Sequence, residues 1–413
     1  MFASGLGAHD DAERAASMAC GACAMRLRRH ADLVFVFISK HHVAQAAAVA
    51  SIIRKALSPT VLVGCTASGV IADATELEDA PSVSILAARL PGVELSTCWT
   101  DDLIADEAEE DHAARLADRL GAGDDLRAAF MLADPFSVPL VRLLPSLNAA
   151  RGAGRSVPIF GGLASASGEP GGNAVLLNDR LETRGGVLVS MRGSIAVDAL
   201  VSQGCRPFGP TFVITKARRN LIFELGGRPA LEVVSATVSD LTEQQREGLK
   251  AGLFLGRVVN EYKSHFGRGD FLIRNVVGVD TEHAALAINE QVSVGQTVRL
   301  HMRDAQTAHE DLALLLDAQK LYAPPAGVLL ITCGGRGRQM FGGPNHDAGA
   351  VLRAFAPQPA GEAAAKPGIA IEPGTAARVP LAGFFAAGEI GPLDGTNFVH
   401  GQTVCAAIFR SSA

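Results

Sequence analysis

The sequence has few aromatic residues and no cluster of basic ones. Aromatic side chains make up 5% of the 413 residues, with one tryptophan and two tyrosines. The net charge is −6, and lysine and arginine are spread along the chain. A nucleic-acid-binding surface needs a cationic face and often rings on which bases stack. The composition therefore argues against a nucleic-acid partner.

Long hydrophobic runs are also missing, although the mean hydropathy is positive at +0.21. The longest uncharged apolar runs have the length of a strand, well below the ~20 residues that a membrane-spanning helix needs. Near the N-terminus stand Asp10, Asp11 and Glu13, where a secretory signal would be basic and then apolar. The sequence predicts a soluble cytoplasmic protein that does not associate with a membrane.

The cysteines do not form a recognisable disulfide or metal framework. There are seven, an odd number, and they are scattered and mostly beside apolar residues. Cys20 and Cys23 have redox-motif spacing, but they precede the first predicted strand and no second pair completes a zinc site. A phosphate-binding Gly-x-x-x-x-Gly-Lys run is absent from the sequence. We therefore expect reduced, packed thiols, no metal and no cofactor.

What the sequence does contain is a short glycine–alanine phrase that occurs three times. The copies are 63–71, 160–166 and 382–390, and the first glycine of each is Gly64, Gly161 and Gly383. Each follows an apolar run typical of a buried strand, then a segment with helical spacing, then a turn; the apolar runs are 33–38, 129–132 and 328–331. Strand, helix and strand in this order predict a βαβ unit with parallel strands. A unit that recurs decides the fold prediction.

The first copy shows the pattern most clearly. A helix is predicted over 43–57 and ends before Pro59, and 61–63 form the second strand. The glycine phrase is expected where that strand ends, at the edge where α/β sheets usually bind ligands. The predicted fold class is α/β, with mixed β-sheets layered with helices and built from repeated βαβ units in two related halves.

Several stretches of the sequence also occur in a recognisable order. They are 61–71 with 81–90, 204–210 leading into Lys216, 274–280, 298–304, 333–337 and 380–392. In this order they resemble the FIST family. The resemblance implies a FIST N-terminal domain over 32–228 and a FIST C-terminal domain over 229–393. An N-terminal helical extension over 1–31 and a closing strand and tail over 394–413 would flank them.

The resemblance implies a sensory module that binds a small ligand, for which amino acids or similar metabolites are suggested. Family members are fused to F-box, histidine kinase, chemoreceptor or cyclic-dinucleotide output domains. We expect none of these here, so the resemblance implies signalling through an unidentified partner or through the protein's own assembly. The sparse charge of this alanine-rich chain allows a homo-oligomer.

The ligand site is predicted around the glycine phrases. Their backbone amides would form a concave rim that favours an anion; the residues concerned are Gly64, Cys65, Thr66, Gly161, Gly162 and Gly388. Arg336, between two glycines after a strand, is the first choice for gripping a carboxylate. Glu389 stands among small and apolar residues and would hold an ammonium group. The alternative is that Arg336 pairs with Glu389 and only fastens two loops.

Four further residues complete the predicted site. Arg303 and Asp304 form a polar pair at a strand end, Cys333 precedes the loop of Arg336, and His400 enters the last strand near Glu389. Each has an ordinary structural alternative, such as hydrogen bonding to loop backbone.

A cysteine-dependent hydrolase or transferase is the second functional hypothesis. Cys65, Cys205 and Cys333 lie beside glycines, and His346 or His400 could serve as a base. A thiol nucleophile needs a base within hydrogen-bond reach, which a sequence does not reveal. No catalytic residue is assigned, and binding without catalysis is the preferred interpretation.

Overall fold

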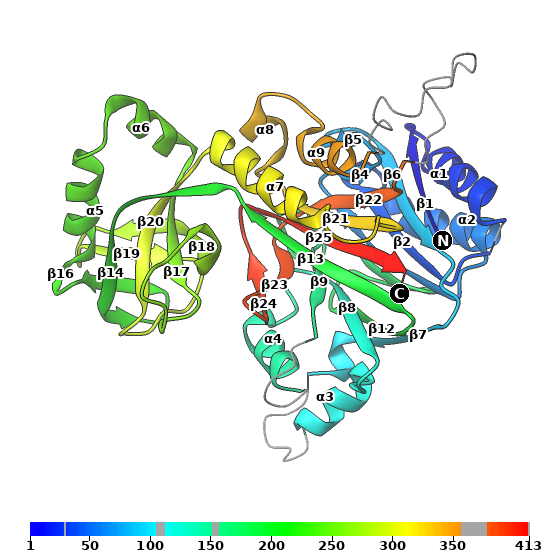
Figure 1. The fold of residues 1–413 in the computed structure, drawn as a ribbon, viewed down its shortest axis with the longest axis horizontal. Helices are drawn as coiled ribbons and strands as arrows, with labels where there is room; N and C mark the ends of the chain where they lie inside the picture. Colours follow the sequence, from blue (N-terminus) through cyan, green and yellow to red (C-terminus); the bar gives the residue numbers. More distant parts are fainter. Residues whose placement is uncertain (29, 105–111, 151–156, 357–377, 412–413) are drawn as a thin grey trace.

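The computed structural model describes residues 1–28, 30–104, 112–150, 157–356 and 378–411. These residues form a body of three sheets and a separate β-barrel, which lies at the left in Figure 1. Parallel and antiparallel strands share each sheet of the body, and helices cover the sheets. The predicted α/β class with mixed sheets is confirmed.

The body consists of three units with the same order of elements. Unit 1 contains β1 (Phe2–Ala8), α1 (Ala12–Leu27), β2 (Leu33–Ser39), α2 (Ala46–Leu57), β3 (Val61–Ala67), β4 (Val70–Ala72), β5 (Thr75–Leu77) and β6 (Ser82–Ala88). Unit 2 contains β7 (Val93–Trp99), α3 (His112–Leu120), β8 (Leu126–Ala133), α4 (Leu140–Ala149), β9 (Ile159–Leu163), β10 (Val175–Leu177), β11 (Arg180–Glu182) and β12 (Gly186–Gly193). Unit 3 contains β13 (Ile195–Gln203), α7 (Ala305–Gln319), β21 (Gly327–Cys333), α8 (Gly337–Phe341), α9 (His346–Ala354), β22 (Leu381–Ala386), β23 (Glu389–Leu393), β24 (Thr396–His400) and β25 (Thr403–Ser411).

The three sheets also share one strand arrangement. Their orders are β1-β6-β2-β3-β10-β11, β7-β12-β8-β9-β23-β24 and β13-β25-β21-β22-β4-β5. The central pairs β2–β3, β8–β9 and β21–β22 are parallel, as the three predicted βαβ units require. The expectation of two related halves is replaced by three units, because the third glycine phrase belongs to a sheet of its own.

Each unit gives its hairpin to the sheet of another unit. Hairpin β4–β5 of unit 1 pairs with β22, β10–β11 of unit 2 pairs with β3, and β23–β24 of unit 3 pairs with β9. The exchange runs in one direction around the body. Every sheet therefore contains strands from two units, which ties the three units into one folding block.

The inner faces of the three sheets enclose one aromatic core. Phe37 stacks on Phe384 with ring centroids 4.6 Å apart, which joins the sheets of units 1 and 3. Phe130 of unit 2 lies 5.2 Å from Phe35 and 5.6 Å from Phe409. The outer faces pack on α1 and α2, on α3 and α4, and on α7 and α9. Burial on both faces explains the continuous apolar strands in the sequence.

The sequence predicted the glycine phrases at the ends of strands. Instead, the first glycine of each phrase, called here a phrase glycine, lies inside a strand. Gly64 is opposite Val36, Gly161 opposite Met131 and Gly383 opposite Leu330, in the same place of each parallel pair. A Cβ at any of them would overlap the carbonyl oxygen of the opposite residue. Glycine at these places therefore serves the close approach of two strands.

Both termini are integral to the body. The helix predicted over 1–31 is preceded by β1, which pairs along its length with β6, and α1 then packs on this sheet. The predicted closing strand, β25, lies between β13 and β21 within the sheet of unit 3. Neither terminal segment is an appendage.

The barrel is inserted into unit 3, between β13 and α7. It contains β14 (Cys205–Arg218), β15 (Leu221–Leu225), β16 (Arg228–Pro229), α5 (Ala230–Ser239), α6 (Glu243–Gly248), β17 (Leu253–Val258), β18 (Phe271–Asp280), β19 (Ala285–Ile288) and β20 (Thr297–Arg303). Six strands close on one another because β14 pairs with both β20 and β15. The division near residue 229 falls inside this barrel, so the sheets cross the domain boundary drawn from sequence.

Candidate functional site

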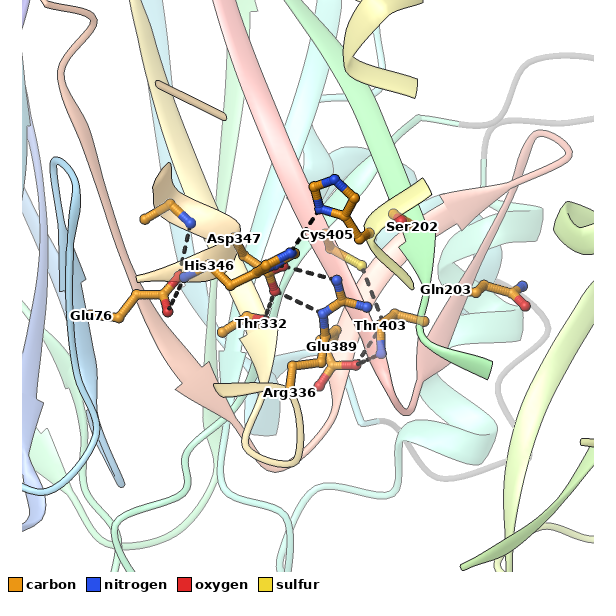
Figure 2. A network of polar contacts seen from close by, with 12 residues as sticks. Glu76, Ser202, Gln203, Thr332, Arg336, His346, Asp347, Glu389, Thr403 and Cys405 are labelled. Atoms are coloured by element: carbon orange, nitrogen blue, oxygen red, sulfur yellow. Dashed lines mark hydrogen bonds and ion pairs between the residues drawn. The ribbon is translucent and has the colours of Figure 1, made fainter. Parts of the chain in front are cut away.

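The candidate site lies where the barrel joins unit 3. The two connecting segments run side by side: Cys205 is in register with Arg303, and the Asp304 amide donates to the Gly204 carbonyl over 3.2 Å. The loop after β21, the start of β23 and the start of β25 supply the remaining side chains. Figure 2 shows Arg336 with Asp347 on one side and Glu389 on the other.

Arg336 is fully buried and held by Asp347 instead of Glu389. Its Nε donates to Oδ2 of Asp347 over 2.7 Å, and its Nη2 donates to Oδ1 over 2.9 Å. Burial alone would raise the pKa of the Asp347 carboxyl, but the guanidinium holds it well below its usual range. The predicted alternative, a pair of Arg336 with Glu389, is replaced by this bidentate pair.

Asp347 is itself fixed from two sides. It accepts a hydrogen bond from Thr332 Oγ1 over 2.8 Å, and its Oδ1 lies 2.9 Å from Nδ1 of His346. Glu76 of unit 1 accepts from the amides of His346 and Ala348 at the start of α9. The hairpin of unit 1 thus holds the helix that positions Asp347 and, through it, Arg336.

Glu389 is the most unusual side chain of the site. It is fully buried, and its Oε2 accepts from the amide and the hydroxyl of Thr403 over 3.2 and 2.6 Å. Burial raises the pKa of Glu389 to about 8, against the hydrogen bonds of Thr403 and the charge of Arg336. The carboxyl is therefore mostly neutral at pH 7.

The position of Glu389 has two counterparts in the body. Glu389 pairs with Gly162, the residue after a phrase glycine; the same place is taken by Val70 opposite Phe384 and by Val175 opposite Cys65. All three side chains are buried. The fold accepts valine at this place twice, so packing does not require a carboxyl there.

Four buried polar atoms at this junction have no hydrogen-bond partner among the described residues. They are Nη1 of Arg336, Nε of Arg303, Oε1 of Glu389 and Oε1 of Gln402. A Cβ on Gly335 would lie 2.8 Å from Nη2 of Arg303 and 3.1 Å from Oε1 of Gln402, and one on Gly204 would lie 3.0 Å from Nη1 of Arg336. Glycine at both positions therefore lets these side chains lie close against the loop backbone, and burying their donors and acceptors without partners is expensive unless something binds there.

The other predicted site residues divide into two groups. Three of them are near Glu389: Gly162 is opposite it on β9, Gly388 directly precedes it, and the Cys333 thiol lies close to its carboxyl. Asp304 caps α7 at the barrel root and pairs with Arg206 over 3.2 Å. His400 is in register with Glu389, but its Nε2 lies 2.9 Å from the Gly391 carbonyl oxygen and burial lowers its pKa to about 4. The positions Gly64, Cys65, Thr66 and Gly161 belong to the strands around the shared core.

The glycine phrases do converge, but their amides are used within the fold. Ser165 N donates to Thr66 O and Ala387 N donates to Leu163 O, both over 3.1 Å, and Leu163 N donates to Gly388 O over 2.8 Å. These bonds join the three units around their common centre. These amides are therefore not free, and the unpartnered polar atoms at the junction belong to side chains.

The structure does not favour the hypothesis of a cysteine nucleophile. Every cysteine is buried, and burial raises the pKa of Cys205 and of Cys333 to about 12. Of the predicted bases, His400 is bound to a backbone carbonyl and His346 to Asp347. A thiol of this kind is scarcely ionised at neutral pH.

Comparison with known proteins agrees with the resemblance seen in the sequence. The FIST N domain profile matches residues 32–228, and the FIST C domain profile matches residues 230–392. The chain belongs to the FIST family. FIST domains are regarded as sensory, ligand-binding domains of signal transduction. In the described part of this FIST protein, no helix has the length and apolar character needed to cross a membrane.

Curated relatives are similar to this FIST protein over their whole length. An uncharacterized protein of Mycobacterium tuberculosis is 35% identical over 409 residues, which cover 98% of each chain. An uncharacterized protein of Mycobacterium bovis is 35% identical over 402 residues, covering 97% of this chain and 96% of the relative. The combination of body and inserted barrel is therefore expected in these proteins too.

Proposed function

We propose that this FIST protein is a sensor that binds an amino acid or a similar polar metabolite at the root of its barrel and signals through a partner. The observation that carries the proposal is the place of Glu389. A buried carboxyl stands there where the two equivalent hairpins have valine. A polar group that costs stability and is not needed for packing is expected to serve binding.

The unpartnered atoms match the two ends of an α-amino acid. Nη1 of Arg336 and Nε of Arg303 are donors suited to a carboxylate. Oε1 of Glu389 and Oε1 of Gln402 are acceptors suited to an ammonium group. Arg336 keeps its orientation through Asp347, so it would be in place before the ligand arrives.

The barrel is the part of the molecule best suited to carry the signal. Arg303 comes from the barrel, whereas Arg336, Glu389 and Gln402 come from the body. Only two chain crossings join the two parts, at Gly204 and Asp304, and both border the site. A ligand that contacts both parts would fix the barrel against the body and so change the surface offered to a partner.

A thermal-shift screen of the twenty amino acids and of common nucleotides tests the proposal. A ligand present well above its dissociation constant raises the melting temperature of the wild-type protein. The same ligand should leave Glu389→Val unshifted, since valine fits this place in the other hairpins. Val175→Ala, altered at the equivalent place in another hairpin, serves as the control and should keep the full shift. Equal shifts in Glu389→Val and the wild type would refute the proposed site.

A further inference from the structure

The carboxyl of Glu389 is buried, and one of its two oxygens has no hydrogen-bond partner among the described residues. Its side chain is fully buried. Oε2 accepts from the amide and the hydroxyl of Thr403, the Cys333 thiol lies close to the carboxyl, and Oε1 has no hydrogen-bond partner among the described residues. Gly162, directly opposite on β9, has no side chain to contribute. Oε1 is thus shielded from bulk water and left for a group from outside the protein.

No nearby group in the described residues supplies the missing positive charge as a direct pair. Arg336 is committed to Asp347 on two of its nitrogens, and His400, in register on β24, is kept neutral by its burial. The thiols that face Glu389, Cys333 of β21 and Cys405 of β25, have pKa values raised by burial and remain protonated. Thr403 carries no charge. The carboxyl therefore faces one guanidinium that is already paired with Asp347 and otherwise neutral groups.

We propose that ligand binding at this site releases one proton from Glu389. In the ligand-free protein the carboxyl carries its proton. When a cationic nitrogen of the ligand reaches Oε1, the O–H bond breaks, the proton passes to solvent, and the carboxylate pairs with the cation. This inference rests on the proposed function, because it assigns the ammonium end of the ligand to Glu389.

Proton release has a direct consequence for affinity. A ligand that binds only the ionised carboxyl competes with the proton, so its dissociation constant rises about tenfold for each pH unit below the pKa of Glu389. With that pKa at about 8, the affinity should rise from pH 6 to pH 7 and level off above pH 8. The sensor would then respond to ligand concentration and pH together.

The first experiment needs no ligand. Infrared difference spectra at pH 6 of the wild type and Glu389→Gln should show the C=O stretch of a buried protonated carboxyl only in the wild type. This band should disappear as the pH is raised through about 8. A wild-type spectrum without it at pH 6 would show an ionised Glu389 and overturn the inference, whatever the protein binds.

The second experiment measures the coupling by calorimetry with L-alanine and propionate. The two share a carboxylate and differ in the α-ammonium group. In buffers of different ionisation enthalpy at pH 7, L-alanine should release about 0.9 proton per molecule bound, since roughly nine-tenths of a group with this pKa is protonated there. Propionate should release none.

The variant Glu389→Gln separates the possible outcomes. It should bind L-alanine more weakly and with no proton release and no pH dependence. Release that persists in this variant, or wild-type binding without release, overturns the inference. If the infrared band is present but neither L-alanine nor propionate binds, the carboxyl is confirmed as neutral and the proposal of an amino-acid ligand fails instead.

Discussion

The third unit of the body differs from the first two where function would require it to differ. Opposite the residue that follows the phrase glycine, the hairpins of units 1 and 2 have Val70 and Val175, whereas that of unit 3 has Glu389. Unit 1 connects its first strand to its first helix through three residues, 9–11, but unit 3 inserts the whole barrel at the same point. At this one place, two units thus have an apolar side chain and the third has a carboxyl.

This comparison separates what the fold needs from what a site needs. The positions that all three units share, above all the phrase glycines, are packing positions. Glu389, which stands where the other two hairpins have valine, lies at the barrel root. The internal repeat therefore acts as a control within one chain, and exchanging residues between equivalent places tests it.

The largest effect is expected at the phrase glycines. Alanine at Gly64, Gly161 or Gly383 places a Cβ on the carbonyl oxygen of the opposite strand, and strands cannot separate without opening the core. Each substitution should cost about 4 kcal/mol or more in free energy of unfolding, measured by chemical denaturation. Gly21→Ala is the control, because nothing lies near its Cβ and alanine favours a helix. Equal stability of Gly161→Ala and the control would refute the shared role.

The buried pair behind the site should come next. Asp347→Asn leaves the Arg336 guanidinium buried without its counter-charge, and we expect a loss of about 3–5 kcal/mol. Asp317→Asn, which removes the exposed partner of Lys320, should cost about 1 kcal/mol or less. Urea denaturation of both variants checks the difference. Similar losses would mean that Arg336 does not depend on Asp347.

A smaller effect, but one with a definite pH profile, is expected at Glu389. Its pKa is higher in the folded protein, about 8, than the ordinary value of 4.5, so the folded state binds more protons between these values. The contribution of Glu389 to stability should therefore be fully present below about pH 4.5 and be lost progressively as the pH rises to about 8. Glu389→Val should remove this loss.

The reverse substitution tests whether a carboxyl is tolerated at this place in another unit. Val175→Glu puts a carboxyl at the equivalent place beside Cys65, in the apolar core and without Arg336 or Thr403. It should destabilise the protein by about 3 kcal/mol or more at pH 7. Denaturation of both variants across pH 5–9 checks the pair. A neutral effect of Val175→Glu would mean that the scaffold accepts a carboxyl at this place without a site.

The smallest effect on stability is expected at Gly335. An alanine there would meet the ends of two flexible side chains, Arg303 and Gln402, so the free energy of unfolding should change by about 1 kcal/mol or less. Its methyl group would displace these two side-chain ends from their present positions and weaken ligand binding. Gly343→Ala, with open space at its Cβ, should change neither property. Thermal shift with and without a ligand from the screen checks both variants.

Much of the local structure was predictable because it depends on neighbouring residues. The apolar runs at 33–38, 129–132 and 328–331 lie in β2, β8 and β21, and the helix expected over 43–57 includes α2. Arg336 and Glu389 were also predicted as site residues, because charged side chains among glycines and apolar residues are conspicuous in a sequence. Whether they bind a ligand remains a prediction.

Other features were not predictable from local pattern. Asp347 gave no signal, since an acidic residue in the first turn of a helix is ordinary. Gln402 and Gly204 stand in connections whose function depends on what lies opposite. The exchange of hairpins could not be foreseen either, because a two-residue turn fixes the hairpin and leaves open which sheet receives it.

Three strand–helix–strand segments, each with its glycine phrase, and the membership in the FIST family could be recognised from the sequence. Only the tertiary structure decided that the units exchange hairpins, that Arg336 pairs with Asp347, and that Glu389 takes the place of a valine. The physical reason is that periodicity and turn chemistry act over a few residues. Pairing register and burial, in contrast, are set by surfaces that meet only in the folded chain.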